Sequence, residues 1–264
     1  SFKKNVIIVQ HSAANRIACE LPAFGTEYTW MVIAAGKNRE DAVLHHFATG
    51  SVPQTDTAIC RLHILQQATQ NKDGYVFIDG PGVLYDMNGL PVWYLPVIEG
   101  RKIAGNTQVR DLKLSPKGTI TFLIGEQVYE TDYNGTIKWK GPEKALYHHE
   151  FTRLANGHYM ALGNEVLWCR VPDSSDTMLE IAAREPMPGD SGYVQVEFAT
   201  IIEYDRVGRK VWSWSSRDHF VSSDIVYHTG SMFRPYISAH GNSFYFDEKK
   251  NEIYLSFRNI SRII

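Results

Sequence analysis

Residues 128–139 read VYETDYNGTIKW, a β-rich run, a polar turn and a second β-rich run. The same D-x-x-G-x-x-x-W pattern recurs in residues 83–93 and in residues 202–212. The glycine permits the positive φ of a tight hairpin turn, and the aspartate can accept hydrogen bonds from the backbone of the turn. The tryptophan falls on the returning strand, where it can pack between neighbouring sheets. A strand-and-turn unit that repeats in this way predicts the blades of a β-propeller.

The spacing of the repeats indicates the size of one blade. The aspartates of the three copies, Asp86, Asp132 and Asp205, lie 46 and 73 residues apart. The first spacing is typical of one four-stranded blade, and the second leaves room for an insertion over residues 172–192. A second hairpin pattern alternates with the first, in residues 111–118, 151–157 and 244–251. Two hairpins per unit predict four strands per blade, and a plain β-sandwich or barrel is the alternative.

The first part of the chain lacks this repeat. Residues 1–68 contain β-rich runs at 5–9 and 28–33, which predict a small N-terminal β-sandwich domain followed by propeller blades over residues 69–264. The best helical periodicity is short, at residues 38–45 (NREDAVLH). The predicted fold class is therefore all-β, a small N-terminal β-sandwich followed by a β-propeller.

Composition argues against several classes of function. The 264 residues carry 27 Lys and Arg against 29 Asp and Glu, and this balance gives no basic footprint for nucleic acid. No apolar run reaches the roughly 18 residues of a membrane helix, and no signal peptide is visible at the polar start of the chain. Cys19, Cys60 and Cys169 lack the spacing of a zinc site. They are either free thiols or include a Cys19–Cys60 disulfide inside the first domain.

Two histidine-bearing stretches come directly before equivalent strands of the repeat. Equivalent points on successive blades converge around a propeller axis, so we expect imidazoles from two blades to face one pocket. An arginine on a later strand suits the binding of an oxyanion. Together these side chains describe a site for a sulfuryl or phosphoryl group, and no metal site is expected because few carboxylate or thiolate ligands lie nearby. A structural role for all of them is the alternative. The candidate residues of this site are His148, His149, His240, Asn242 and Arg258.

At these residues the sequence resembles the bacterial aryl-sulfate sulfotransferases that work without a nucleotide sulfate donor. The resemblance depends on the order and spacing of three stretches, 148–150 (HHE), 240–243 (HGNS) and 257–259 (FRN), and it covers the chain from about residue 45 onward. It implies a six-bladed propeller behind a small β-sandwich, a phenolic sulfate donor and a phenol acceptor. It also implies no cofactor, transient sulfation of a histidine, and a periplasmic or secreted location.

The resemblance assigns roles to individual residues. It implies that His240, Asn242 and Arg258 would bind or polarise the sulfuryl group and the phenolic oxygen. His149 is the favoured histidine of its pair for the same pocket, and His148 is a candidate substrate-binding residue.

The family's nucleophilic histidine lies on a later blade than its His-x-Asn motif, and this sequence ends at Ile264. We therefore expect an incomplete propeller, completed by a C-terminal segment or a second chain, and no transferase turnover by this chain alone. Two alternatives to an enzyme stay open. One is a non-catalytic propeller that binds a ligand or partner through its rim, and the other is a surface-assembly protein whose β-sandwich makes homodimer contacts.

Overall fold

The chain divides into two compact units, Ser1–Val52 and Pro53–Ile264. The predicted boundary after residue 68 falls later in the chain, and residues 60–66 belong to the second unit, where the Tyr85 hydroxyl donates to the carbonyl of Cys60 at 2.9 Å. The computed structural model describes residues 9–14, 17, 19, 21, 23–52, 60–66, 70, 73–101, 109–143, 146–172, 176–187, 190–225 and 237–264.

The first unit contains a two-stranded antiparallel sheet, β1 (Glu27–Trp30) and β2 (His45–Ala48). The stretch with the best helical periodicity, residues 38–45, contains only a short helix. A single turn of 3-10 helix, η1 (Arg39–Asp41), forms there because none of its residues is buried and nothing anchors a longer helix. Its described residues form this one sheet, so the β-sandwich stays a prediction.

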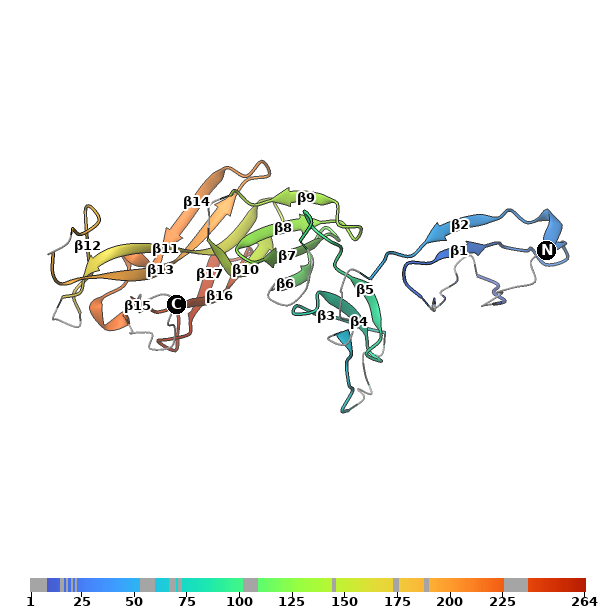
Figure 1. Cartoon of the computed structure of the whole chain (residues 1–264), viewed down its shortest axis with the longest axis horizontal. Coiled ribbons are helices and arrows are strands. Elements are labelled where there is room, and N and C mark those ends of the chain that lie inside the picture. Colours follow the sequence, from blue (N-terminus) through green and yellow to red (C-terminus); the bar gives the residue numbers. More distant parts are fainter. Residues whose placement is uncertain are drawn as a thin grey trace. The chain divides into compact units, whose positions relative to one another are not determined.

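Four sheets follow one another in sequence order along the described residues of the second unit (Figure 1). The first sheet is β3 (Tyr75–Ile78), β4 (Val83–Asp86) and β5 (Pro91–Tyr94). The second is β6 (Val109–Leu114), β7 (Ile120–Ile124), β8 (Gln127–Thr131) and β9 (Ile137–Lys140). Each is an antiparallel meander, as the hairpin repeat predicts.

The third sheet is the largest. Its main path is β10 (Tyr147–Arg153), β11 (Tyr159–Arg170), β13 (Tyr193–Tyr204) and β14 (Lys210–Ser215). Two short strands join it, β12 (Glu180–Ile181) beside β11 and β15 (Ile237–Ser238) parallel to β13. The short helices η3 (Ser216–Asp218) and η4 (Ser222–Asp224) follow β14. The fourth sheet is β16 (Gly241–Asp247), β17 (Glu252–Phe257) and β18 (Arg262–Ile263).

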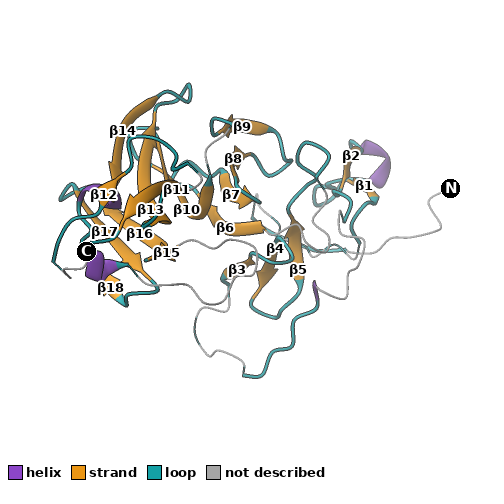
Figure 2. Ribbon diagram, turned by 60° about the vertical axis from the view of Figure 1, so that its left-hand side comes forward, coloured by secondary structure: helices purple, strands orange, loops and turns teal. Residues whose placement is uncertain are grey.

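Strands dominate the described residues of the second unit, and the short helices η3 and η4 follow β14 (Figure 2). The prediction of an all-β fold is therefore confirmed, and successive sheets of consecutive antiparallel strands are consistent with a propeller-like arrangement.

The three predicted turns share one geometry. In each, the aspartate carboxylate accepts the backbone N–H groups of the residues two and four positions later, and the glycine has a φ between 77° and 83°. A side chain at these glycines would be strained by that φ. The turns join β4 to β5, β8 to β9 and β13 to β14, where the sequence pattern predicts them.

Apolar cores lie between consecutive sheets. The first joins residues of the first and second sheets, such as Leu95 and Phe122. The next joins Trp139 of the second sheet to Tyr159 of the third, whose rings stack with centroids 3.9 Å apart. The third core joins Phe198 of the third sheet to Phe244 of the fourth. Packing of one sheet against the next in this way buries the apolar faces of both sheets.

The repeated tryptophan does not have the same environment in every copy. Trp139 is 6 % exposed, and the Trp93 indole donates to the carbonyl of Tyr133 in the next turn along the chain at 2.8 Å. Trp212 instead is 41 % exposed, so its predicted position between sheets is wrong. The reason is that β14 is exposed along most of its length.

The three cysteines are free thiols, Cys19 on the surface and the other two buried. The alternative with a Cys19–Cys60 disulfide is therefore not the arrangement found.

Candidate functional site

The predicted histidines lie at the start of the third and fourth sheets. His148 and His149 are on β10, in a stretch where the pairing with β11 shifts register between Tyr147 and Phe151. His240 directly precedes β16. His149 has a φ of 59° and His240 a φ of 56°, an uncommon conformation for residues other than glycine that is concentrated at functional sites.

The structure brings these two histidines into contact. The Nε2 atoms of His149 and His240 are 3.0 Å apart, although 91 residues separate them in the sequence. At that distance one ring nitrogen donates and the other accepts, so at least one of the two imidazoles is uncharged. Two imidazoles from different sheets therefore lie in contact, and their assignment to a common substrate pocket stays a prediction.

His148 completes a group of three rings. Its centroid is 5.0 Å from that of His149 and 6.0 Å from that of His240. Its Nε2 donates to Oδ1 of Asn164 on β11 at 2.7 Å, because an amide oxygen can only accept. That bond fixes the orientation of the His148 ring, whereas His149 directs its Nε2 at the other sheet.

A buried carboxylate stands behind His240. Glu197 on β13 is 5 % exposed and accepts the hydroxyl of Ser238 at 2.8 Å. The same hydroxyl accepts the backbone N–H of His240 at 2.8 Å, and Oε1 of Glu197 lies 4.0 Å from the His240 Nδ1. Gly241 allows the start of β16 to lie close to β13, because a Cβ at this position would be only 2.6 Å from the Cβ of Ala199.

Two arginines place positive charge beside the imidazoles. Burial, together with the charges of His148, Arg110 and Arg258, lowers the pKa of His149 to about 4. Burial likewise lowers the pKa of His148, against the hydrogen bond that this ring donates to Asn164, which raises it. His149 is therefore uncharged at neutral pH. The backbone N–H of Arg258 donates to the carbonyl of His240 at 2.9 Å, which ties the arginine to the histidine turn.

The fifth predicted residue lies at the edge of this group. Asn242 is an exposed residue on β16, two positions after His240. Within the part of the chain that the structure describes, no hydrogen bond joins its side chain to the three imidazoles. The described residues also contain no group of three or more His, Cys, Asp or Glu side chains placed to hold a metal ion.

Three further residues of the site escaped the sequence analysis. Arg110 lies on β6, the first strand of the second sheet, just as His149 lies on β10, the first strand of the third sheet. This equivalent place in the repeat could have identified Arg110 from the sequence. Glu197 interrupts an apolar run, and a charged residue in a buried strand implies a partner. Asn164 lies inside a long strand without any motif, and no sequence signal distinguishes it.

Sequence comparison assigns the second unit to a family. The profile described as Arylsulfotransferase (ASST) matches residues 51–264. The chain belongs to the arylsulfotransferase family. The resemblance inferred from the histidine, asparagine and arginine motifs is thereby confirmed, and the residues of the site all lie inside the matched region.

Other comparisons add less. No curated protein matches the sequence. A solved structure of a Bacteroides caccae protein of unknown function is similar with a TM-score of 0.37 and 11 % identity, over 72 % of this chain and 55 % of that one. The chain thus spans about half the length of that structure. No helix among the described residues has the length and apolar character needed to cross a membrane.

Proposed function

We propose that residues 51–264 form the sulfuryl-binding part of an aryl-sulfate sulfotransferase. The contact between His149 and His240 beside the charge of Arg258 carries this proposal. It assembles imidazole and guanidinium groups from two sheets of an arylsulfotransferase domain. A sulfate ester offers several acceptor oxygens, and these groups are matching donors.

The arrangement suits stabilisation of a sulfuryl group during transfer. The Arg258 guanidinium binds non-bridging oxygens, and an N–H of a neutral imidazole donates to a non-bridging oxygen or to the phenolic oxygen. Asn242 contributes its amide from the rim of the site. Because His149 is uncharged at neutral pH, it can donate without repelling the two arginines. Glu197 and Ser238 position His240 from behind.

Transfer runs in two balanced steps under this proposal. A nucleophilic imidazole nitrogen attacks sulfur, the bond between sulfur and the donor's aryl oxygen breaks, and the donor phenol departs after its oxygen is protonated. The acceptor phenol then attacks the same sulfur and releases its proton while the N–S bond breaks. By the family pattern the nucleophile belongs to a later blade than His240, so this domain binds and polarises. Phenolic sulfates outside the cytoplasm are the proposed substrates.

Isothermal titration with p-nitrophenyl sulfate tests the binding role. We expect Arg258→Ala to weaken binding about 10- to 100-fold, the effect of losing hydrogen bonds to a charged group. Arg209→Ala is the matched control, because that side chain is 80 % exposed and pairs with Asp205 in a remote turn. Equal affinities in the two variants would contradict the proposal. Sustained transfer of sulfate to a phenol by this chain alone would contradict the placement of the nucleophile.

A further inference from the structure

The long hairpin of β11 and β13 continues beyond the imidazoles. The two strands pair without a register shift from Tyr159↔Tyr204 to Arg170↔Tyr193. Alternate residues of a strand point to the same face, and cross-strand partners share that face. One face of the hairpin therefore carries Asn164, Val166 and Trp168 on β11, opposite Ala199, Glu197 and Gln195 on β13.

This face is the one that meets the histidines. Asn164 accepts the hydrogen bond of His148, and Glu197 lies behind His240. Val166 pairs with Glu197, so it stands directly beside that carboxylate on the same side of the sheet. Trp168 is one step further along the same strand, roughly 6–7 Å per two residues.

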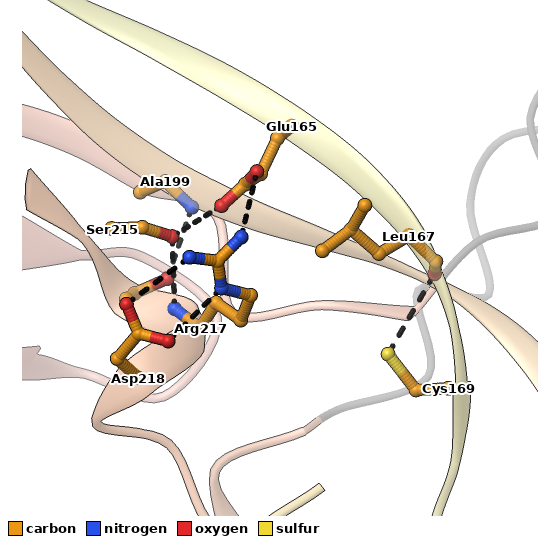
Figure 3. A network of polar contacts seen from close by, with 8 residues as sticks. Glu165, Leu167, Cys169, Ala199, Ser215, Arg217 and Asp218 are labelled. Carbon is orange, nitrogen blue, oxygen red and sulfur yellow. Dashed lines mark hydrogen bonds and ion pairs between the residues drawn. The ribbon is translucent and has the colours of Figure 1, made fainter. Parts of the chain in front are cut away.

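The opposite face of the same strand is already occupied. Glu165 accepts the hydroxyl of Ser215 at 2.5 Å and pairs with Arg217 at 3.4 Å (Figure 3). Leu167 and Cys169 pack into the core shared by the third and fourth sheets. The side chains of Val166 and Trp168 are directed away from both of these contacts, because they alternate with them along the strand.

Val166 and Trp168 are not core residues. The valine is 40 % exposed, and the tryptophan is half-buried. They form an apolar surface that begins beside the polar groups of the site. An aryl sulfate has the same two parts in the same order, a charged sulfuryl group joined through one oxygen to a flat apolar ring.

We propose that Val166 and Trp168 form the subsite for the aromatic ring of the sulfate ester. The indole stacks on the ring of the substrate, and the valine covers its edge nearest the sulfuryl group. This subsite rests on the proposed function, because it presupposes that the sulfuryl group is bound at the imidazoles. It makes the domain select aryl over alkyl sulfates.

The test compares p-nitrophenyl sulfate with methyl sulfate, which has the sulfuryl group but no ring. Affinities of both are measured by titration calorimetry for the wild-type chain, Trp168→Ala, Trp168→Phe and Trp212→Ala. Trp212 is the control, because it is an exposed tryptophan of the same sheet on β14. Far-ultraviolet circular dichroism and urea unfolding establish that each variant is folded.

We expect Trp168→Ala to weaken p-nitrophenyl sulfate about 3- to 10-fold and leave methyl sulfate unchanged. Trp168→Phe should restore most of the preference for the aryl ester, and Trp212→Ala should behave as wild type. An unchanged ratio of the two affinities in Trp168→Ala would overturn the subsite alone, with binding still dependent on Arg258. If the wild-type chain bound neither ester, the proposed function would fall and the subsite with it.

Discussion

The first strands of the second and third sheets share an irregularity and use it differently. On β6 the pairing shifts register between Arg110 and Lys113, and Asp111 has a φ of 53°. On β10 the pairing shifts over the stretch that contains His149, whose φ is 59°. The Asp111 carboxylate accepts the backbone N–H of Phe151 at 2.7 Å and pairs with Lys113 at 2.9 Å. The His149 ring meets another imidazole instead.

Asp111 on β6 therefore connects two sheets, whereas His149 on β10 belongs to the candidate functional site. A carboxylate is an acceptor, and the partners of Asp111 are the backbone of the next sheet and a lysine that also reaches Glu150. An uncharged imidazole keeps a nitrogen that can donate or accept, and His149 is surrounded by two other imidazoles and by positive charge. The same backbone irregularity, a register shift with a residue of positive φ, thus connects two sheets at β6 and exposes imidazole groups to one another at β10.

The largest expected difference is in stability. Asp111→Ala should lower the free energy of unfolding by about 3 kcal/mol, because it removes the partner of the Phe151 N–H and one of the two carboxylates paired with Lys113. His149→Ala should lower it by about 1 kcal/mol or less, because no hydrogen bond joins that ring to the backbone of the described residues. Urea unfolding followed by circular dichroism measures both values.

Asp111→Asn provides the internal control for this comparison. The amide keeps an oxygen for the Phe151 N–H and loses only the charge, so its stability should exceed that of Asp111→Ala. If Asp111→Ala and His149→Ala destabilised the chain equally, β6 and β10 would not differ in role.

The turns could be predicted from the sequence because their determinants are local. Asp86 and Gly89 fix one turn within four residues, and the same holds for the other two copies. The meeting of His149 with His240 was predictable because a repeat places equivalent residues near one another. The exposure of Trp212 could not be predicted, because the burial of a strand depends on what packs against it rather than on its own sequence. Asn164 was invisible for the same reason, since its role comes from a histidine on another strand.

The two residues should also give opposite dependences of stability on pH. His149 has a pKa of about 4 in the folded chain against 6.5 unfolded, so between these values only the unfolded state holds its proton. Its contribution therefore makes stability increase as pH rises from 4 to 6.5. Burial raises the pKa of Asp111 from 3.8 to about 7, against the lowering effect of Lys113. Its contribution makes stability decrease as pH rises through that interval.

Unfolding midpoints in urea between pH 4 and 6.5 separate these contributions. Relative to wild type, His149→Gln should flatten any rise of stability with pH, and Asp111→Asn should steepen it. Each slope should stay below the limit of about 1.4 kcal/mol per pH unit for one proton, because solvent screens the partly exposed His149 ring. Changes of the same sign in both variants would show that the two sites do not titrate in opposite directions.

The smallest expected effect concerns Arg110, which connects the two strands. It precedes Asp111 on β6, yet its charge lowers the pKa values of both His148 and His149. Arg110→Gln should therefore raise the pKa of His149 by about half a unit, the size expected of a partly screened charge. Nuclear magnetic resonance of the imidazole C–H groups measures the shift directly. Lys117→Gln, an exposed cation in the turn after β6, should leave it unchanged. An equal shift in both variants would mean that the pKa of His149 responds to net charge alone. The contribution of β6 would then be limited to the contact of Asp111 with the neighbouring sheet.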